Sequence, residues 1–74
     1  MTRLPRITGR QLIRTLGQIG FEVLRVRGSH TFLKHPDGRT TVVPVHSGEI
    51  IGPGLLRTIL REIEISLDEL GDHL

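Results

Sequence analysis

Residues 21–45 read FEVLRVRGSHTFLKHPDGRTTVVPV, and this stretch decides the fold. Two turn signals divide it: Gly28-Ser29 is typical of a two-residue hairpin turn and Pro36-Asp37-Gly38 of a three-residue one. In the second turn, proline presets the first position and glycine accepts the left-handed conformation. The β-rich runs between the turns cover residues 21–27, 30–35 and 40–45. The stretch therefore predicts a three-stranded antiparallel meander.

Helical patterns flank this stretch on both sides. Thr8-Gly9-Arg10-Gln11 has the form of a capping box, and apolar residues then recur at helical spacing up to Gly20, which predicts a helix over residues 9–19. Pro53 and the apolar stripe that follows it predict a second helix, and Ser66 begins a short final turn. The expected fold is α+β, a double-stranded-RNA-binding-like α-β-β-β-α arrangement with the helices on one face of the three-stranded antiparallel sheet.

The chain has 74 residues, which predicts one domain over residues 1–74 with a short N-terminal arm, residues 1–7. It has no cysteine, which excludes disulfides, thiolate metal sites and a cysteine nucleophile. Its uninterrupted apolar runs are far shorter than a membrane span or a signal-peptide core. We therefore expect a cytoplasmic protein without membrane contact.

Charge is divided unevenly along the chain. Residues 1–39 carry eight basic against two acidic side chains, a net of +6, and residues 40–74 carry two basic against six acidic, a net of −4. Nine of the ten cations are arginines, whose planar guanidinium suits phosphate better than the lysine ammonium does. The first half of the chain therefore predicts a polyanionic partner.

The hairpins assign each side chain to one of two faces, because successive strand residues point in opposite directions. The predicted cross-strand pairs are Arg27 with His30, Arg25 with Phe32, Val23 with Lys34, Phe32 with Val42, and His30 with Pro44. The face toward the helices is expected to carry Leu24, Val26, Thr31, Leu33, Thr41, Val43 and Val45. The opposite face, called the outer face below, is expected to carry Phe21, Val23, Arg25, Arg27, His30, Phe32, Lys34, Val42 and His46.

The outer face combines cations, aromatic rings and imidazoles, a composition that suits RNA. Phe32 can stack on an unpaired base, and three cations, Arg25, Arg27 and Lys34, can neutralise phosphates. His30 can exchange protons near neutral pH, which RNA cleavage through the ribose 2′-hydroxyl requires. In this register His46 is a diagonal neighbour of His30, and an acid–base role, an RNA contact and no role all remain open for it. No histidine spacing, carboxylate cluster or cofactor motif indicates a metal or a cofactor.

Six segments of the chain occur together in a distinctive order: TGRQLI (8–13), GFE (20–22), RGSH (27–30), HPDGR (35–39), VPVH (43–46) and PGLLRTIL (53–60). Over residues 7–70 the chain resembles the HicA family of toxins from type II toxin–antitoxin systems. The resemblance implies a double-stranded-RNA-binding-like fold, cleavage of messenger RNA independently of the ribosome, and a HicB-type antitoxin as the protein partner. Together with the histidine chemistry above, which needs no metal, it leads us to expect a metal-independent endoribonuclease that acts on single-stranded mRNA. The family's catalytic histidine lies in its Gly-Ser-His motif, which corresponds to His30. The oligomeric state stays open, a homo-oligomer within the antitoxin complex included.

Two other functions fit the same residues. A non-catalytic RNA-binding module would use Phe21, Phe32 and the cations, with His30 as one more contact. A protein-interaction domain would present Phe32 and Val42 to a partner, since exposed apolar patches often mark interfaces. Loss of RNA cleavage with retained binding after substitution of His30 separates the enzyme from the binding module.

Overall fold

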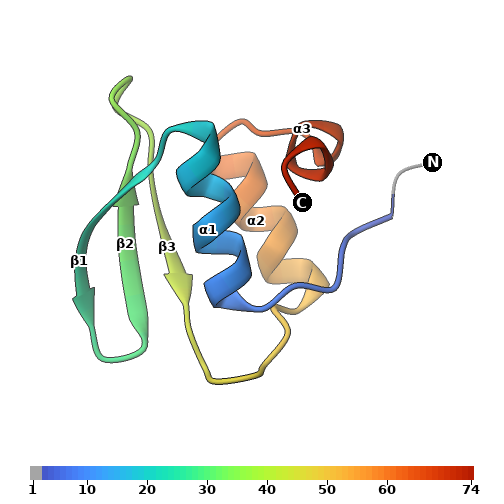
Figure 1. The fold of residues 1–74 in the computed structure, drawn as a ribbon, viewed down its shortest axis with the longest axis horizontal. Helices are drawn as coiled ribbons and strands as arrows, with labels where there is room; N and C mark the ends of the chain where they lie inside the picture. The colour runs from blue at the N-terminus through green and yellow to red at the C-terminus, as the bar shows by residue number, and fades with distance from the viewer. Residues whose placement is uncertain (1–2) are drawn as a thin grey trace.

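The computed structural model describes residues 3–74 and has the element order α-β-β-β-α-α (Figure 1). Its elements are α1 (Gly9–Ile19), β1 (Glu22–Arg27), β2 (His30–Lys34), β3 (Thr40–Pro44), α2 (Pro53–Glu62) and α3 (Leu67–Asp72). The strands form one antiparallel sheet in the order β1-β2-β3. The predicted α+β fold is confirmed, and α3 is the predicted final turn of helix. Of the predicted N-terminal arm, residues 1 and 2 lie outside the described residues.

The helices lie toward one edge of the sheet. Both α1 and α2 pack against β3, whereas β1 forms the opposite edge (Figure 1). Apolar side chains from the three helices, from β2 and β3 and from the turn after α2 are almost completely removed from solvent: Leu12, Leu16, Leu33, Val43, Leu56, Ile59, Ile63 and Leu70. Within residues 3–74, no helix has both the length and the apolar character needed to cross a membrane.

The predicted capping box starts α1. The Gln11 amide donates to the Thr8 hydroxyl at 3.2 Å, and the Thr8 amide donates to the Gln11 side-chain oxygen at 2.8 Å. At the other end, Gly20 has a φ of 118° and its amide donates to the Leu16 carbonyl. These two caps satisfy backbone groups that a helix leaves unpaired at its ends, so the bounds of α1 follow from local chemistry.

The sheet register follows the prediction except at one point in β1. The confirmed pairs are Arg27 with His30, Arg25 with Phe32, Phe32 with Val42, and His30 with Pro44. The predicted pair of Val23 with Lys34 is wrong, because a β-bulge places Leu24 without a partner between Val23 and Arg25. Lys34 therefore pairs with Glu22, and Val23 pairs with Leu33.

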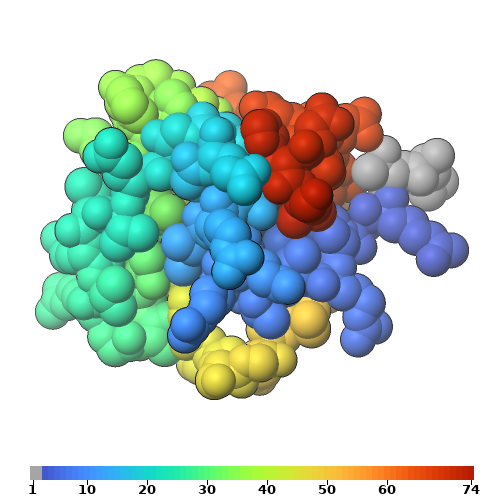
Figure 2. Space-filling view, viewed as in Figure 1, coloured from blue at the N-terminus to red at the C-terminus, as the bar shows by residue number. Residues whose placement is uncertain are grey.

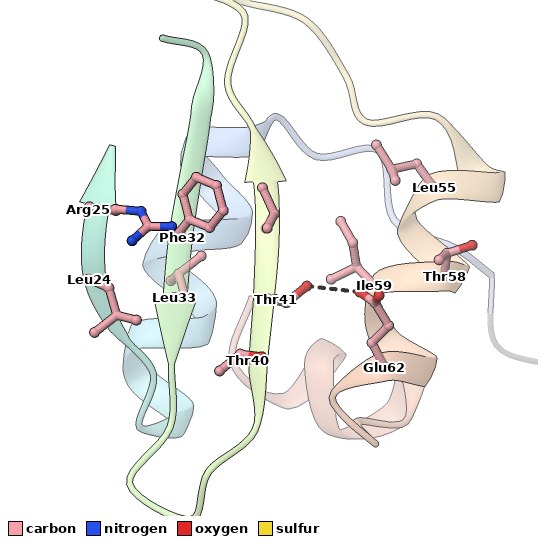
Figure 3. A pocket seen from close by; sticks show the side chains of 11 residues that line it. Leu24, Arg25, Phe32, Leu33, Thr40, Thr41, Leu55, Thr58, Ile59 and Glu62 are labelled. Atoms are coloured by element: carbon pink, nitrogen blue, oxygen red, sulfur yellow. Dashed lines mark hydrogen bonds between the residues drawn. The ribbon is translucent and has the colours of Figure 1, made fainter. Parts of the chain in front are cut away.

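The bulge exchanges the faces of two residues. Val23 shares the helix side of the sheet with its partner Leu33, whereas Leu24 lies with Arg25 and Phe32 on the outer face (Figure 3). The predicted positions of Val23 and Leu24 were therefore wrong. A bulge places two consecutive residues on about the same side of the strand, which no simple alternation of residues reveals.

The predicted core is confirmed in β2 and β3 but not in β1. Four of its members are buried, namely Thr31, Leu33, Thr41 and Val43, while Val45 is half-buried. Leu24 and Val26 are 59% and 61% exposed, so their predicted burial was wrong. Because α1 and α2 pack on β3, the helices do not cover the far edge of the sheet.

Phe21 lies in the core rather than on the outer face, where it was predicted. It precedes β1, and its amide donates to the Leu16 carbonyl at 2.9 Å, so the end of α1 directs it inward. Phe21 is 3% exposed. The His35 ring meets it edge-on with centroids 5.1 Å apart, and the Arg39 guanidinium lies 5.3 Å from its centroid.

The turn between β2 and β3 is tied to the end of α2 by polar contacts. Arg39 donates to the Asp37 carboxylate through its backbone amide at 3.1 Å and through Nε at 2.8 Å, and to the Ile63 carbonyl through Nη1 at 2.6 Å. The backbone bond, more than the others, lowers the pKa of Asp37 below its ordinary value of 3.8. His35 Nδ1 accepts from the Asp37 amide at 3.2 Å when neutral, and it lies 3.0 Å from a carboxylate oxygen to which it donates when protonated.

Candidate nucleic-acid interface

The hairpin of β1 and β2 brings four of the predicted site residues onto the outer face. Arg27 lies opposite His30, and Arg25 lies opposite Phe32. Directly opposite residues have Cβ atoms about 4.5–5.5 Å apart and point to the same side. Because the neighbours of Phe32 in β2 are buried against the helices, His30 and Phe32 point away from them. The hairpin therefore presents two guanidiniums beside an imidazole and an aromatic ring.

Arg25 and Phe32 form a stacked pair. The Arg25 guanidinium carbon lies 4.6 Å from the centroid of the Phe32 ring, within the range of a cation–π contact (Figure 3). The ring is half-buried and the arginine is exposed. Such a contact at an exposed site is worth about 0.5–1 kcal/mol and orients the guanidinium while leaving its N–H groups accessible. The pair offers an anion a donor and an unpaired base a flat surface.

His30 stands at the start of β2, between Arg27 of β1 and Pro44 of β3. The residue before it is held in place, because the Ser29 carbonyl accepts a hydrogen bond from the Val45 amide at 2.6 Å. The imidazole is exposed, and within residues 3–74 it has no hydrogen-bond or ion-pair partner. Both ring nitrogens are therefore accessible to a ligand on the outer face.

Two other predicted residues lie further from this cluster. Lys34 ends β2 on the same face, four residues from His30, which corresponds to about 13 Å along a strand. His46 is exposed and lies two residues beyond the end of β3, and its carbonyl accepts a hydrogen bond from the Glu49 amide in the next loop. The pairing of His46 with His30 stays a prediction, because His46 lies outside the hydrogen-bonded ladder.

A groove runs across the outer face from β1 to α2 (Figure 3). It has a volume of about 580 Å³ and is lined by Leu24, Arg25, Phe32, Leu33, Thr40, Thr41, Val42, Leu55, Thr58, Ile59 and Glu62. The Thr41 hydroxyl donates to the Glu62 carboxylate at 3.2 Å and so ties β3 to α2. Leu24, Val42 and Leu55 remain exposed. This mixture of apolar surface and a few polar groups suits an unpaired base or the apolar side chain of a protein.

The α2 side of the groove was not predicted from the sequence. Leu55, Thr58, Ile59 and Glu62 are spaced i, i+3, i+4 and i+7, so they share one side of the helix. That spacing is visible in the sequence. Which part of the sheet this side of α2 borders depends on how α2 lies against β3. The residue spacing does not reveal how α2 lies.

A comparison with family models gives one match that covers most of the chain. The model described as the HicA toxin of bacterial toxin-antitoxin matches residues 9–65, from the first residue of α1 to just beyond α2, and so includes the whole sheet. A search of curated proteins found no match. A toxin of this family has an antitoxin as its partner and RNA as its substrate class. Because this match covers well over half of the chain, the chain belongs to the HicA family of toxins from bacterial toxin–antitoxin systems.

Proposed function

We propose that this toxin is an endoribonuclease that cleaves single-stranded mRNA without a metal ion, with His30 as its general acid–base group. One observation carries the proposal: an exposed imidazole, which has no hydrogen-bond or ion-pair partner among residues 3–74, lies directly opposite Arg27 and beside the stacked Arg25 and Phe32. A group that transfers protons and a group that binds phosphate are thus adjacent on one face. RNA cleavage needs that combination.

The reaction uses the ribose as its own nucleophile. Neutral His30 accepts the proton of a 2′-hydroxyl, the 2′-oxygen bonds to the adjacent phosphorus, and the bond from this phosphorus to the 5′-oxygen breaks. The protonated imidazole then gives a proton to the leaving 5′-oxygen. The products carry a 2′,3′-cyclic phosphate and a 5′-hydroxyl. Negative charge accumulates on the phosphoryl oxygens during attack, and Arg27 opposite His30 is the group that stabilises it.

The remaining predicted residues bind the RNA strand in this proposal. Arg25 and Lys34 contact phosphates, Phe32 stacks on a base, and His46 contacts the strand beyond the end of β3. Since the outer face is a continuous surface of the sheet, one extended strand reaches all of them. The groove toward α2 accommodates a base next to the Phe32 ring.

We propose further that a HicB-type antitoxin inhibits the toxin by covering the outer face. The apolar residues around the groove support this. Leu24, Val42 and Leu55 are exposed there, and apolar side chains contribute nothing to the binding of an RNA phosphate, whereas a protein partner can bury them. A protein that buries these side chains also covers the neighbouring His30. RNA and antitoxin then compete for one surface.

The nuclease proposal is tested with purified protein, a long single-stranded RNA and excess EDTA. The unmodified protein should cleave the RNA into products with 2′,3′-cyclic phosphate ends, and His30→Ala should cleave at least about 100-fold more slowly. His73→Ala is the matched control, because it removes an imidazole next to α3, far from the outer face, and it should cleave like the parent. Circular dichroism shows whether each variant keeps the fold.

Three results would contradict the proposal. Equal cleavage by the parent and the His30→Ala variant would assign the activity to another group or to a contaminant. RNA binding without cleavage by either protein would support the non-catalytic binding module instead. Cleavage that stops in EDTA and returns with a divalent metal ion would reject the metal-independent reaction.

A further inference from the structure

β1 forms an exposed edge of the sheet and carries apolar side chains that the other described residues leave uncovered. β1 is six residues long and every residue is exposed, since α1 and α2 pack mainly against β3. Three of its side chains are apolar, and Val23, Leu24 and Val26 are 49%, 59% and 61% exposed. Figure 2 shows the strand at the rim of the molecule, uncovered by the helices. An edge strand with free backbone groups and exposed apolar side chains is a template for pairing with another strand.

We propose that β1 pairs antiparallel with β1 of a second copy of this chain, so that two three-stranded sheets join into one sheet of six strands. The pairing is two-fold symmetric. Glu22 lies opposite Arg27 of the second copy, Val23 opposite Val26, and Leu24 opposite Arg25.

The β-bulge makes this register possible. Glu22 and Arg27 point to the outer face, as do their partners Lys34 and His30, and the bulge adds Leu24 and Arg25 to the same face. Val23 and Val26 point to the helix side. Read from either end, β1 therefore has the same order of faces: outer, helix side, outer, outer, helix side, outer.

Symmetric pairing of two identical strands requires that palindromic order, because directly opposite residues share a face. Every other register that pairs four or more residues sets an outer residue against a helix-side residue. In a strand without the bulge, the six side chains would alternate strictly between the two faces. The same register would then set an outer residue opposite a helix-side residue in every pair. The observed backbone thus selects one register.

The side chains in this register are chemically complementary. The Glu22 carboxylate faces the Arg27 guanidinium of the second copy at both ends of the paired strands. Within residues 3–74, neither side chain has an ion pair or hydrogen bond in its own chain. Glu22 is also one of only two acidic residues in the first 39 positions, and it stands where the opposing strand brings an arginine.

The apolar residues are complementary as well. Val23 and Val26 face each other across the two-fold axis on the helix side, where each is exposed in the single chain. There is room for this contact, because α1 and α2 pack against β3 at the far edge of each sheet (Figure 1). The pairing joins the two outer faces and brings Arg25 and Arg27 of both copies onto one continuous surface.

Sedimentation equilibrium of the full chain from micromolar to millimolar concentration tests the proposal. The unmodified protein should show a concentration-dependent dimer. Glu22→Arg and Arg27→Glu should each weaken dimerisation by about tenfold, because each sets like charges opposite one another at both ends of the strand pair. The double variant Glu22→Arg with Arg27→Glu should restore it, because the same pairs form with their charges exchanged.

Glu49→Arg is the matched control, since it makes the same change of charge in an exposed loop away from β1, and it should dimerise like the parent. Hydrogen exchange gives a second readout, in which the amides of β1 become protected as the concentration rises. The proposal is overturned by a monomer at every concentration, by a dimer that Glu22→Arg leaves unchanged, or by a double variant that stays as weak as the single ones. A variant that loses its circular dichroism signal is replaced by Val26→Lys, which should abolish the dimer.

Discussion

His30 owes its position to the short turn that precedes it. Gly28 has a φ of 58°, a left-handed conformation that glycine adopts readily, and it lets β1 return as β2 after two residues. This tight connection sets Arg27 directly opposite His30. A phosphate bound by that guanidinium therefore lies within reach of the imidazole, and a longer turn would separate the two groups.

Phe32 is the residue at which RNA binding and antitoxin binding are expected to overlap. Phe32→Ala removes a half-buried ring from the groove, together with the surface on which Arg25 lies. We expect the antitoxin complex to weaken by at least about tenfold, the range typical of an aromatic anchor in an interface. Isothermal titration with purified antitoxin measures this loss.

Leu74→Ala provides the control for that titration, because Leu74 is an exposed apolar residue at the C-terminus and does not line the groove. The control should bind the antitoxin like the parent. An affinity for Phe32→Ala equal to that of the parent would remove Phe32 from the antitoxin interface.

At the scale of elements, the junction between α1 and β1 depends on one glycine. Gly20 ends the helix with a φ of 118°, and a Cβ added there would lie 2.7 Å from the Nε2 atom of His35. At this junction the chain passes from the helix into the sheet. The His35 ring lies beside the junction and contacts the ring of Phe21. Helix end, strand and turn are thus coupled at one point.

Gly20→Ala should therefore destabilise the protein by at least about 1–2 kcal/mol, because an L-residue at this φ is strained and its methyl group displaces the His35 ring. Gly17→Ala is the matched control within the same helix. Its added Cβ meets nothing within 4 Å, and alanine favours the helix, so it should stabilise by about 0.5–1 kcal/mol. Urea unfolding measures both changes, and equal stabilities of the two variants would contradict the role of Gly20.

At the scale of the whole molecule, the uneven charge along the chain becomes a difference between surfaces. The outer face carries Arg25, Arg27 and Lys34, whereas most of the acidic residues follow from the end of α2 onward, through α3. A polyanion approaching the molecule is thus attracted to the sheet and repelled by the C-terminal helices. The electrostatic part of RNA binding should arise at the outer face.

The salt dependence of RNA binding measures this. In the His30→Ala background, which prevents cleavage, Arg27→Ala should reduce the slope of log K against log salt by about 0.7, the value for one phosphate contact to a single strand. Arg14→Ala removes an exposed arginine from α1, which covers the other side of the sheet, and should leave the slope unchanged. A slope that falls equally in both variants would mean that the RNA has no preferred face.

The amino-acid sequence by itself determined the elements, the turns and most of the register. The capping box at Thr8, the left-handed Gly20 and the two-residue turn before His30 are local features, because each depends on residues within a few positions of one another. The pairings of Arg27 with His30 and of Arg25 with Phe32 follow from the turn alone. The central part of the candidate site was therefore predictable.

Only the tertiary structure decided which surfaces are covered. The burial of Phe21, the exposure of Val26 and the α2 side of the groove depend on how the helices lie on the sheet, and the bulge at Leu24 appears only in the pairing of β1 with β2. Apolar residues in β1 have the same pattern whether or not a helix packs on them, and α1 and α2 pack on β3 instead. Helix docking is set by packing among residues distant in the sequence, and for that reason the exposure of Leu24 and Val26 in β1 was not predicted.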